Sequence, residues 1–359
     1  MARRLSPLPL PTWDEIVAIA SENGIEHLGV APADVLGRAR TEINRRKQAG
    51  LHAGMGFTYR NPERSTDPQR AVEGARSIIV AARPYRATDE PDRPDGTQAR
   101  VGRYAWVDHY APLREGLRVI ARRLRRADHR AIAFADDNSI VDREVAYLGG
   151  LGWFGKNANI LLAGAGSFFV LGSIVTTADY PVSTPVADGC GSCRRCLDGC
   201  PTGAIIAPGV VDANKCLAWL VQQPGTFPVQ FREALGDRLY GCDDCQEVCP
   251  PTVRLGEKHR IPLANDADAE PVQAWVDVLE LLDASDEQLI ERHGRWYLAG
   301  RDPIWWRRNA LIVLGNVGDA TDRRTQLSLA VYRAHENEML REHATWATER
   351  LSQRLVAAT

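Results

Sequence analysis

Cysteine is the residue type in this chain whose spacing most directly indicates chemistry. All eight cysteines of the 359 residues lie between Cys190 and Cys249. Thiols this close together could staple loops as disulfides, hold a zinc ion or hold an iron–sulfur cluster. A disulfide framework would suit an oxidising compartment and would spread its cysteines more widely along the chain. The clustering therefore indicates metal binding.

The spacing of the cysteines favours iron–sulfur clusters over zinc. The first run, "CGSCRRCLDGCP", reads C-x2-C-x2-C-x3-C-P, which is the spacing of bacterial two-cluster ferredoxins. The second run, "CDDCQEVCP", has three cysteines and the same ending, and Cys216 supplies the missing fourth thiol. Zinc ribbons combine two C-x2-C pairs and have no need of the C-x3-C-P endings.

In ferredoxins of this type the last cysteine of a run binds the other cluster, which predicts two crossed ligand sets. One [4Fe–4S] cluster would be held by Cys190, Cys193, Cys196 and Cys249. The other would be held by Cys200, Cys216, Cys242 and Cys245. Such a pair relays electrons one at a time, so the reactive centre must lie elsewhere in the chain.

Apolar patterning predicts the elements that must position this centre. Strands are expected at short apolar runs, and helices where apolar residues recur at helical spacing. The expected strands are 25–31, 77–82, 131–135 and 168–177. The expected helices are 13–24, 113–127, 307–319 and 324–355.

The order of these elements predicts a fold of the α+β class. A disordered leader, residues 1–12, would precede a mixed α/β catalytic domain, 13–180. A ferredoxin-like domain for the two clusters would span 181–260. The C-terminal region, 261–359, is expected to be helical, either as HEAT-like hairpins or as a plain helical cap.

Composition and charge exclude several classes of protein. The chain is 44% hydrophobic and 25% charged, as ordinary soluble proteins are, and its net charge of -2 excludes a globally basic nucleic-acid binder. No apolar run approaches the ~20 residues of a membrane helix, so we expect no membrane partner. The Arg3–Arg4 pair is not followed by the apolar region of an export signal. We therefore expect the protein to stay in the cytoplasm.

The segment "GLGWFG" (150–155) matches the G-x-G-x-x-G pattern of dinucleotide-binding folds. That pattern follows a strand and opens a helix. Here a helical "REVAYL" precedes the segment and a strand-like "NILLA" follows it, which is the wrong order. We interpret the glycines as positions where the backbone closely approaches something flat or bulky.

Four segments together resemble the epoxyqueuosine reductase family, and the resemblance extends over about residues 13–320. They are "FADDNSIVDR" (134–143), "GLGWFGKN" (150–157), "GCDDCQEVCP" (241–250) and "RRNALIVLGNVGD" (307–319). The resemblance implies that the N-terminal domain binds cobalamin and that the clusters deliver electrons to its cobalt. It also implies that the substrate is epoxyqueuosine at the wobble position of the tRNA anticodon. An external donor, such as flavodoxin or ferredoxin with its reductase, would then be a partner, and we expect a monomer.

The resemblance also implies a proton donor directly after the strand 131–135. The family's aspartate falls at Asp136, with Asp137 as the rival. An acid is needed because an alkoxide is a poor leaving group when the epoxide C–O bond breaks. We expect Asp136 to be catalytic and Asp137 to cap the following helix.

Further cofactor contacts follow from the same resemblance. The candidates are Tyr59, Arg60, Asp136, Arg143, Lys156 and Asn157. Arg143 could pair with the acid or with a phosphate, and Lys156 and Asn157 would either face the corrin or lie in a solvated turn. Three departures from the family pattern bear on the substrate. The order Asp108–His109–Tyr110 replaces D-Y-H, Ser139 replaces a proline, and Gln223 stands where a glutamate is usual.

Arginines could supply the basic surface that a tRNA enzyme needs. One group is Arg114, Arg118, Arg122, Arg123, Arg125, Arg126 and Arg130. The other is Arg301, Arg307, Arg308, Arg323 and Arg324. The alternative is a solvated helix face. Trp305 and Trp306 could stack on a base, but we favour a place in the core.

Two other functions fit parts of the pattern. A related cobalamin reductase could act on a small organic substrate, as dehalogenases do, although respiratory dehalogenases carry an export signal. A ferredoxin-type electron carrier would use the clusters alone, and it would not need a whole α/β domain upstream of them.

Overall fold

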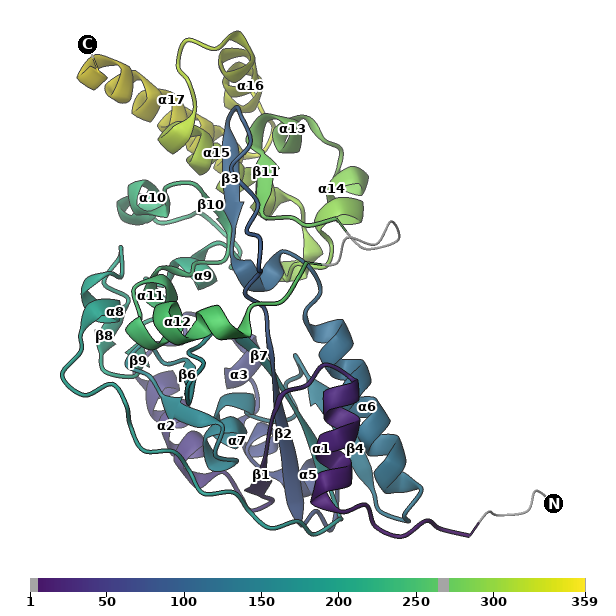
Figure 1. Cartoon of the computed structure of the whole chain (residues 1–359). Coiled ribbons are helices and arrows are strands. Elements are labelled where there is room, and N and C mark those ends of the chain that lie inside the picture. Colours follow the sequence, from purple (N-terminus) through teal and green to yellow (C-terminus); the bar gives the residue numbers. More distant parts are fainter. Residues whose placement is uncertain (1–5, 264–270, 359) are drawn as a thin grey trace.

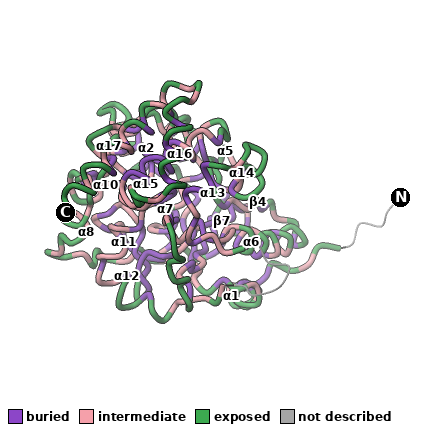
Figure 2. The backbone as a smooth tube through the Cα atoms, turned by 90° about the horizontal axis from the view of Figure 1, so that it is seen from above, coloured by how far each residue is buried: buried purple, intermediate pink, exposed green. Residues whose placement is uncertain are grey.

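The computed structural model describes residues 6–263 and 271–358. Figure 1 shows a sheet with its helices at the bottom, the cysteine-bearing segments above it on the left, and the C-terminal helices at the top. Buried residues run through the middle of the molecule, and exposed residues surround them (Figure 2). Within the described residues, no helix has both the length and the apolarity that crossing a bilayer requires.

A four-stranded antiparallel sheet forms the lower body (Figure 1). Its strands, in spatial order, are β1 (His27–Pro32), β2 (Ser77–Pro84), β7 (Phe169–Thr176) and β4 (Ala131–Ala135). They match the four expected strands. Ile79 and Ala81 of β2 lie in one apolar cluster, and Ile78 and Val80 lie in another. Because both faces of the sheet are covered, the strands read as continuous apolar runs.

Helices cover each face of this sheet. On one face lie α1 (Trp13–Glu22) and α6 (Tyr110–Arg125), and on the other lie α2 (Gly37–Gln48) and α7 (Asp142–Leu148). Helix α6 begins three residues before the expected start. Asp108 explains the difference, because its Oδ1 accepts hydrogen bonds from the Tyr110 and Ala111 amides, at 2.9 Å each. Three short helices follow α2: α3 (Gly56–Tyr59), α4 (Pro62–Ser65) and α5 (Pro68–Ala71).

A second, three-stranded sheet joins distant parts of the chain. Strand β3 (Gln98–Val101) pairs in parallel with β10 (Arg238–Tyr240) and antiparallel with β11 (Trp275–Asp277). The expected domain boundaries are linear along the chain, whereas this pairing is not. A strand from within 13–180 forms a sheet with one strand of the cysteine-rich segment and one strand that lies beyond it.

The cysteine-bearing region consists of short elements. They are α8 (Arg195–Asp198), β8 (Ile205–Ala207), β9 (Val210–Val211), α9 (Leu217–Leu220), α10 (Val229–Leu235), α11 (Asp244–Glu247), α12 (Pro250–Leu255) and η2 (Gly256–His259). A hairpin of β5 (Gly152–Phe154) and β6 (Ile160–Leu162) lies upstream of it in the chain. The order of α7, β5 and β6 is the helix–strand–strand order that argues against a dinucleotide-binding turn.

The C-terminal part is helical, as expected. It contains α13 (Val278–Asp283), α14 (Asp286–His293), α15 (Ile304–Val317), α16 (Arg323–Arg333) and α17 (Glu338–Ala358). Helix α15 is buried almost throughout and packs against α17 and α13. Its burial explains why apolar residues occupy nearly every side of this helix. A HEAT-like character remains a prediction.

The N-terminal leader differs from the expectation of disorder where the structure describes it. Residues 1–5 of the predicted leader lie outside the described residues. The Leu8 amide donates to the Arg126 carbonyl at 2.7 Å, and the Tyr180 hydroxyl donates to the Pro11 carbonyl at 2.8 Å. The prolines of this segment exclude a helix, but they do not prevent it from lying against α6 in an extended form.

Candidate active site

The eight thiols are free and gather in two groups. Burial raises the pKa of the Cys196 thiol, and the charges of three neighbouring cysteines raise it further. These neighbours are Cys249, Cys190 and Cys193. Cys249 and Cys190 also belong to one apolar cluster, around Trp153. The first group thus has the membership that the crossed spacing predicts.

The second group centres on Cys245. Burial raises the pKa of this thiol well above its ordinary value, and three other cysteines add to the effect. They are Cys242, Cys216 and Cys200. The Ala204 amide points at the Cys200 sulfur, 3.3 Å away, as a donor to a bound thiolate would. That each group of cysteines binds an iron–sulfur cluster remains a prediction.

The spread of the sulfur atoms argues against zinc. Among the residues that the structure describes, no three of the eight sulfurs lie within 4.8 Å of one another. Four sulfurs around one tetrahedral zinc ion would stand about 3.8 Å apart, since each Zn–S bond is about 2.3 Å long. A [4Fe–4S] cube spreads its ligands more widely because each thiolate binds a different iron.

Lys156 and Asn157 hold the cysteine loops. The Lys156 ammonium donates to the carbonyls of Gly191 (2.6 Å) and Cys193 (2.9 Å). The buried Asn157 amide donates to the Cys245 carbonyl at 3.2 Å. The buried Asn157 does not lie in a solvated turn, and corrin contacts by Lys156 and Asn157 remain a prediction.

The glycines of "GLGWFG" allow close approach, but to the protein's own backbone. A Cβ on Gly152 would lie 2.0 Å from the Leu161 carbonyl oxygen across the β5–β6 hairpin. A Cβ on Gly150, where φ is +72°, would lie 2.6 Å from the Thr184 carbonyl oxygen. No cofactor is needed to explain these two glycines.

Asp136 and Asp137 form a loop directly after the edge strand β4. Asp136 is exposed and has a φ of 55°, in the left-handed region that costs a non-glycine residue energy. Asp137 Oδ1 accepts a hydrogen bond from the Ser139 amide at 2.7 Å. Helix α7 begins later, after Val141, so Asp137 stabilises a turn and does not cap this helix, contrary to expectation.

The electrostatic surroundings of Asp136 suit a proton donor. Although the residue as a whole is exposed, the surrounding protein removes water from its carboxyl and so raises the pKa; the charges of Asp108 and Asp137 raise it further, whereas Arg114 opposes the rise. Arg114 lies 3.7 Å from Asp108. A carboxyl with a raised pKa keeps its proton to higher pH and is therefore a better general acid near neutrality.

Two half-buried neighbours lie close enough to Asp136 for its charge to shift their pKa values. Burial raises the pKa of Tyr110 well above its ordinary value, and the charges of Asp136 and Asp142 add to the rise. Burial also raises the pKa of Asp142 strongly, with Asp136 as the next cause. Asp142 Oδ1 is buried without a hydrogen-bond partner among the described residues. His109 instead packs against Tyr85, with ring centroids 5.8 Å apart, and burial lowers its pKa to about 4.

Sequence reasoning missed Asp142 because an acid in the first turn of a helix is ordinary there. Its burial at a loop that also holds Asp136 depends on tertiary packing. The only available signal was its place within the block "ADDNSIVDR", one residue before Arg143.

Arg143 lies between the acids and the second cysteine group. Its guanidinium donates to the Ala158 carbonyl at 3.2 Å. Its charge lowers the pKa values of Tyr110 and Asp142 on one side and of Cys216 on the other. It also acts on Tyr59, whose pKa is raised by burial. The structure therefore brings Tyr59 and Arg143 together, and Arg60 follows as an exposed residue at the end of α3.

Most of the candidate tRNA-binding arginines have acidic or carbonyl partners. Glu115 pairs with Arg122 at 2.9 Å and approaches Arg118 to 3.8 Å. Arg308 is fully buried and donates to carbonyls of the cysteine-bearing region. The expectation that Arg308 lies on the surface is therefore wrong. Trp306 is buried, which confirms a place in the core. Arg114 is the arginine of α6 that acts on Asp136.

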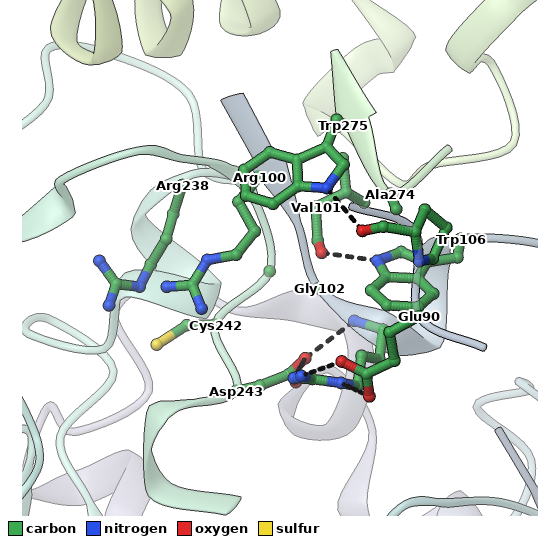
Figure 3. A pocket seen from close by; sticks show the side chains of 13 residues that line it. Glu90, Arg100, Val101, Gly102, Trp106, Arg238, Cys242, Asp243, Ala274 and Trp275 are labelled. Atoms are coloured by element: carbon green, nitrogen blue, oxygen red, sulfur yellow. Dashed lines mark hydrogen bonds and ion pairs between the residues drawn. The ribbon is translucent and has the colours of Figure 1, made fainter. Parts of the chain in front are cut away.

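A small cavity beside Cys242 is rich in arginine (Figure 3). Its Arg103 pairs with Glu90 at 2.7 Å and with Glu247 at 2.5 Å. Its Arg238 binds both carboxylate oxygens of Asp244 at 2.7 Å. Carboxylates neutralise these guanidinium groups, so ion pairs line the cavity beside the second cysteine group. The cavity is therefore poorly suited to bind phosphate.

Family models match two parts of the chain. Residues 189–252 match a 4Fe-4S double cluster binding domain, and residues 65–137 match the family described as epoxyqueuosine reductase QueG, DUF1730. An epoxyqueuosine reductase from Lactococcus garvieae is 31% identical over 350 residues, covering 94% of this chain and 95% of that protein.

Solved structures are similar along nearly the same length. An epoxyqueuosine reductase crystallised with an epoxyqueuosine-modified tRNA-Tyr stem loop has a TM-score of 0.83 and 29% identity, covering 94% of this chain and 89% of that one. The Bacillus subtilis epoxyqueuosine reductase, with an aspartate catalytic loop swung out of its active site, has a TM-score of 0.82 and 29% identity. This match covers 94% of our chain and 90% of the Bacillus subtilis chain.

Proposed function

The chain belongs to the epoxyqueuosine reductase family, and on that premise we propose that it reduces epoxyqueuosine in tRNA to queuosine. The epoxide takes up two electrons and two protons, its two C–O bonds break, and an alkene and water result. The observation that carries the proposal is the match over 94% of the chain, which includes the loop after β4 and both cysteine runs.

We propose the two cysteine groups as the ligands of two [4Fe–4S] clusters. The matched double-cluster domain and the crossed proximity of the thiols support this assignment. Burial and mutual repulsion raise thiol pKa values in both groups, and bound iron would offset that cost because it stabilises the thiolates. The influence of Arg143 on Cys216 supports a second cluster on the side of Asp136, with electrons entering at the first from an external donor.

We propose that cobalamin binds between Cys216 and the loop of Asp136. Tyr59 and Arg143 would hold it, and the unpartnered Asp142 Oδ1 is an acceptor suited to one of the corrin's amide side groups. When bound, the clusters supply single electrons and cobalamin supplies a strongly reducing cobalt centre. This donor set fits the group because a corrin rim both donates and accepts hydrogen bonds.

Asp136 is the proposed proton donor. Its proton goes to the epoxide oxygen as the C–O bond breaks, which prevents the build-up of alkoxide charge. Burial raises the pKa values of Tyr110 and Asp142, and Asp108 and Arg114 shift the pKa of the acid in opposite directions. Its exposed, left-handed loop fits a segment that closes over the nucleoside when tRNA binds.

We further propose the division into a cobalamin-binding domain (13–180), a ferredoxin-like domain (181–260) and a HEAT-like helical region (261–359). Strand β3 is the exception to this linear division, since it pairs with β10 and β11. The three parts would then act as one body, with the reaction centre and its electron supply held by shared strands.

Nucleoside analysis of tRNA from a strain lacking this gene tests the proposed function. We expect epoxyqueuosine to accumulate and queuosine to return when the wild-type gene is restored. Restoration with Asp136→Asn should leave epoxyqueuosine in place. A deletion strain that still makes queuosine, with no second gene of this family, would rule the proposal out.

A further inference from the structure

Three side chains beside the edge strand β1 bring together potential metal ligands other than the cysteines. Glu26 and His27 stand at the start of β1, and His259 ends η2. One carboxylate oxygen and one ring nitrogen of each histidine all lie within 4.8 Å of one another. The Glu26 Oε2 and the His259 Nδ1 are 3.8 Å apart.

The two ring nitrogens lack hydrogen-bond partners. His27 Nε2 and His259 Nδ1 are both buried, and neither has a donor or acceptor within reach among the described residues. Buried polar atoms without partners are uncommon and costly, so each calls for an explanation such as a bound ion. Both histidines belong to the same three-residue group as the Glu26 carboxylate.

The surrounding structure holds the two imidazoles in place. The Phe169 ring stands edge-on to His27 at 5.1 Å and lies 5.9 Å from His259. The segment after His259 is fixed by two backbone hydrogen bonds, from Ile261 N to the Arg86 carbonyl and from Thr88 N to the Ile261 carbonyl, each 2.9 Å. A ligand set made by two anchored segments is preorganised.

Charged neighbours leave the Glu26 carboxylate available. Arg83 is near it, but its guanidinium donates to the Gly24 carbonyl at 2.8 Å. Glu257, in η2, pairs with Arg86 and Arg260 at 2.8 Å and 2.7 Å. The group thus combines one carboxylate and two imidazoles, which is a common ligand set for zinc-class ions.

We propose that Glu26, His27 and His259 form a binding site for a divalent transition-metal ion of the zinc class. Nitrogen and oxygen ligands of a tetrahedral zinc ion stand about 3.3 Å apart, so small side-chain rotations would close the present spacing. A water molecule would complete the coordination. The ion would fasten the edge strand β1 to the segment that leaves the cysteine-bearing region, independently of the reductase reaction.

The test uses the whole protein, reconstituted without oxygen so that iron and sulfide already occupy the cysteines. Zinc is added, excess metal is removed, and retained zinc is measured by mass spectrometry beside iron. We expect one retained zinc per chain, with nitrogen and oxygen ligands and no sulfur in its X-ray absorption spectrum. His259→Gln and Glu26→Gln should weaken zinc binding by at least about tenfold, with iron content unchanged.

Matched controls are His129→Gln and Glu22→Gln, which replace the same residue types outside this group. They should bind zinc as the wild type does. Zinc should also raise the melting temperature of the wild type and of both controls, but not of His259→Gln. No retained zinc, a sulfur shell around it, or equal binding by His259→Gln and the wild type would overturn the proposal and leave a plain Glu26–His259 ion pair.

Discussion

Asp136 and Asp137 are neighbouring carboxyls whose surroundings give them different roles. The carboxyl of Asp136 has a raised pKa and faces Tyr110, whereas that of Asp137 accepts a hydrogen bond from the Ser139 amide. The family resemblance placed the acid at Asp136, but residue types alone could not separate it from Asp137, because the difference arises from groups on α6 and α7. Asp108 and Asp142 were not expected to take part for the same reason.

At the scale of single residues, we expect Asp136→Asn to lower the rate of epoxide reduction by a factor of roughly 10²–10⁴, which is the usual contribution of a general acid. The amide keeps the shape but cannot give a proton. Asp137→Asn should keep most of the activity and stability, because its amide oxygen can still accept the hydrogen bond from the Ser139 amide. Single-turnover rates and thermal melts measure both effects. Normal turnover by Asp136→Asn would exclude it as the acid.

The pH dependence should follow the charge of Arg114. Because only protonated Asp136 can act, activity falls as pH rises through its pKa. Arg114 lowers that pKa, so Arg114→Gln should raise it and move the alkaline limb of kcat/KM to higher pH. Arg118→Gln, one turn further along α6 and beside Glu115, is the control and should leave the limb in place. A shift to lower pH in Arg114→Gln would contradict this electrostatic arrangement.

Among the elements, the long strands and helices were predictable and the short paired ones were not. Strands β1, β2, β7 and β4 read clearly because helices bury both of their faces. Strand β3 is four residues long, and its partners β10 and β11 lie far along the chain, so no local pattern marks it. Likewise, Lys156 and Asn157 were expected either to face the corrin or to lie in a solvated turn, and no local pattern indicated that they bind the cysteine loops.

The turn after β5 should therefore control cluster retention. Lys156→Met removes two hydrogen bonds from a charged group to the first cysteine loop, worth roughly 1–3 kcal/mol. We therefore expect a chelator to remove iron from the first cluster faster than in the wild type. Electron paramagnetic resonance spectra recorded during the incubation measure this loss. Asn157 donates to the Cys245 carbonyl, so Asn157→Ala should speed iron loss from the second cluster instead. If both variants lost iron equally fast from both clusters, Lys156 and Asn157 would not each stabilise a different cluster.

At the scale of the whole molecule, the C-terminal helices are tied to the cysteine-bearing region by a buried arginine. Arg308 of α15 donates to the carbonyls of Leu220, Val221, Gln223 and Gly225. In the sequence it stands beside Arg307 in an apparently basic run, so its burial could not be read from composition. The family-specific blocks were readable because the chemistry of clusters and acid requires particular residue types at close spacing.

Arg308→Met should accordingly destabilise the protein by at least about 3 kcal/mol, because several buried carbonyls lose their donor. Arg324→Met breaks only an exposed pair with Asp283 and should cost less than about 1 kcal/mol. Thermal unfolding of the reconstituted protein measures the difference. Equal melting temperatures for the two variants would mean that the C-terminal helices unfold independently of the rest.

Whether this chain reduces epoxyqueuosine in tRNA is tested most directly by mass spectrometry of the modified nucleoside. Reconstituted protein with iron, sulfide and cobalamin is incubated without oxygen with an epoxyqueuosine-modified anticodon stem–loop and a low-potential reductant. We expect the nucleoside to lose one oxygen atom and become queuosine, and we expect Asp136→Asn to leave it unchanged. Unaltered epoxyqueuosine after incubation with wild-type protein whose clusters are demonstrably reduced would contradict the proposed function.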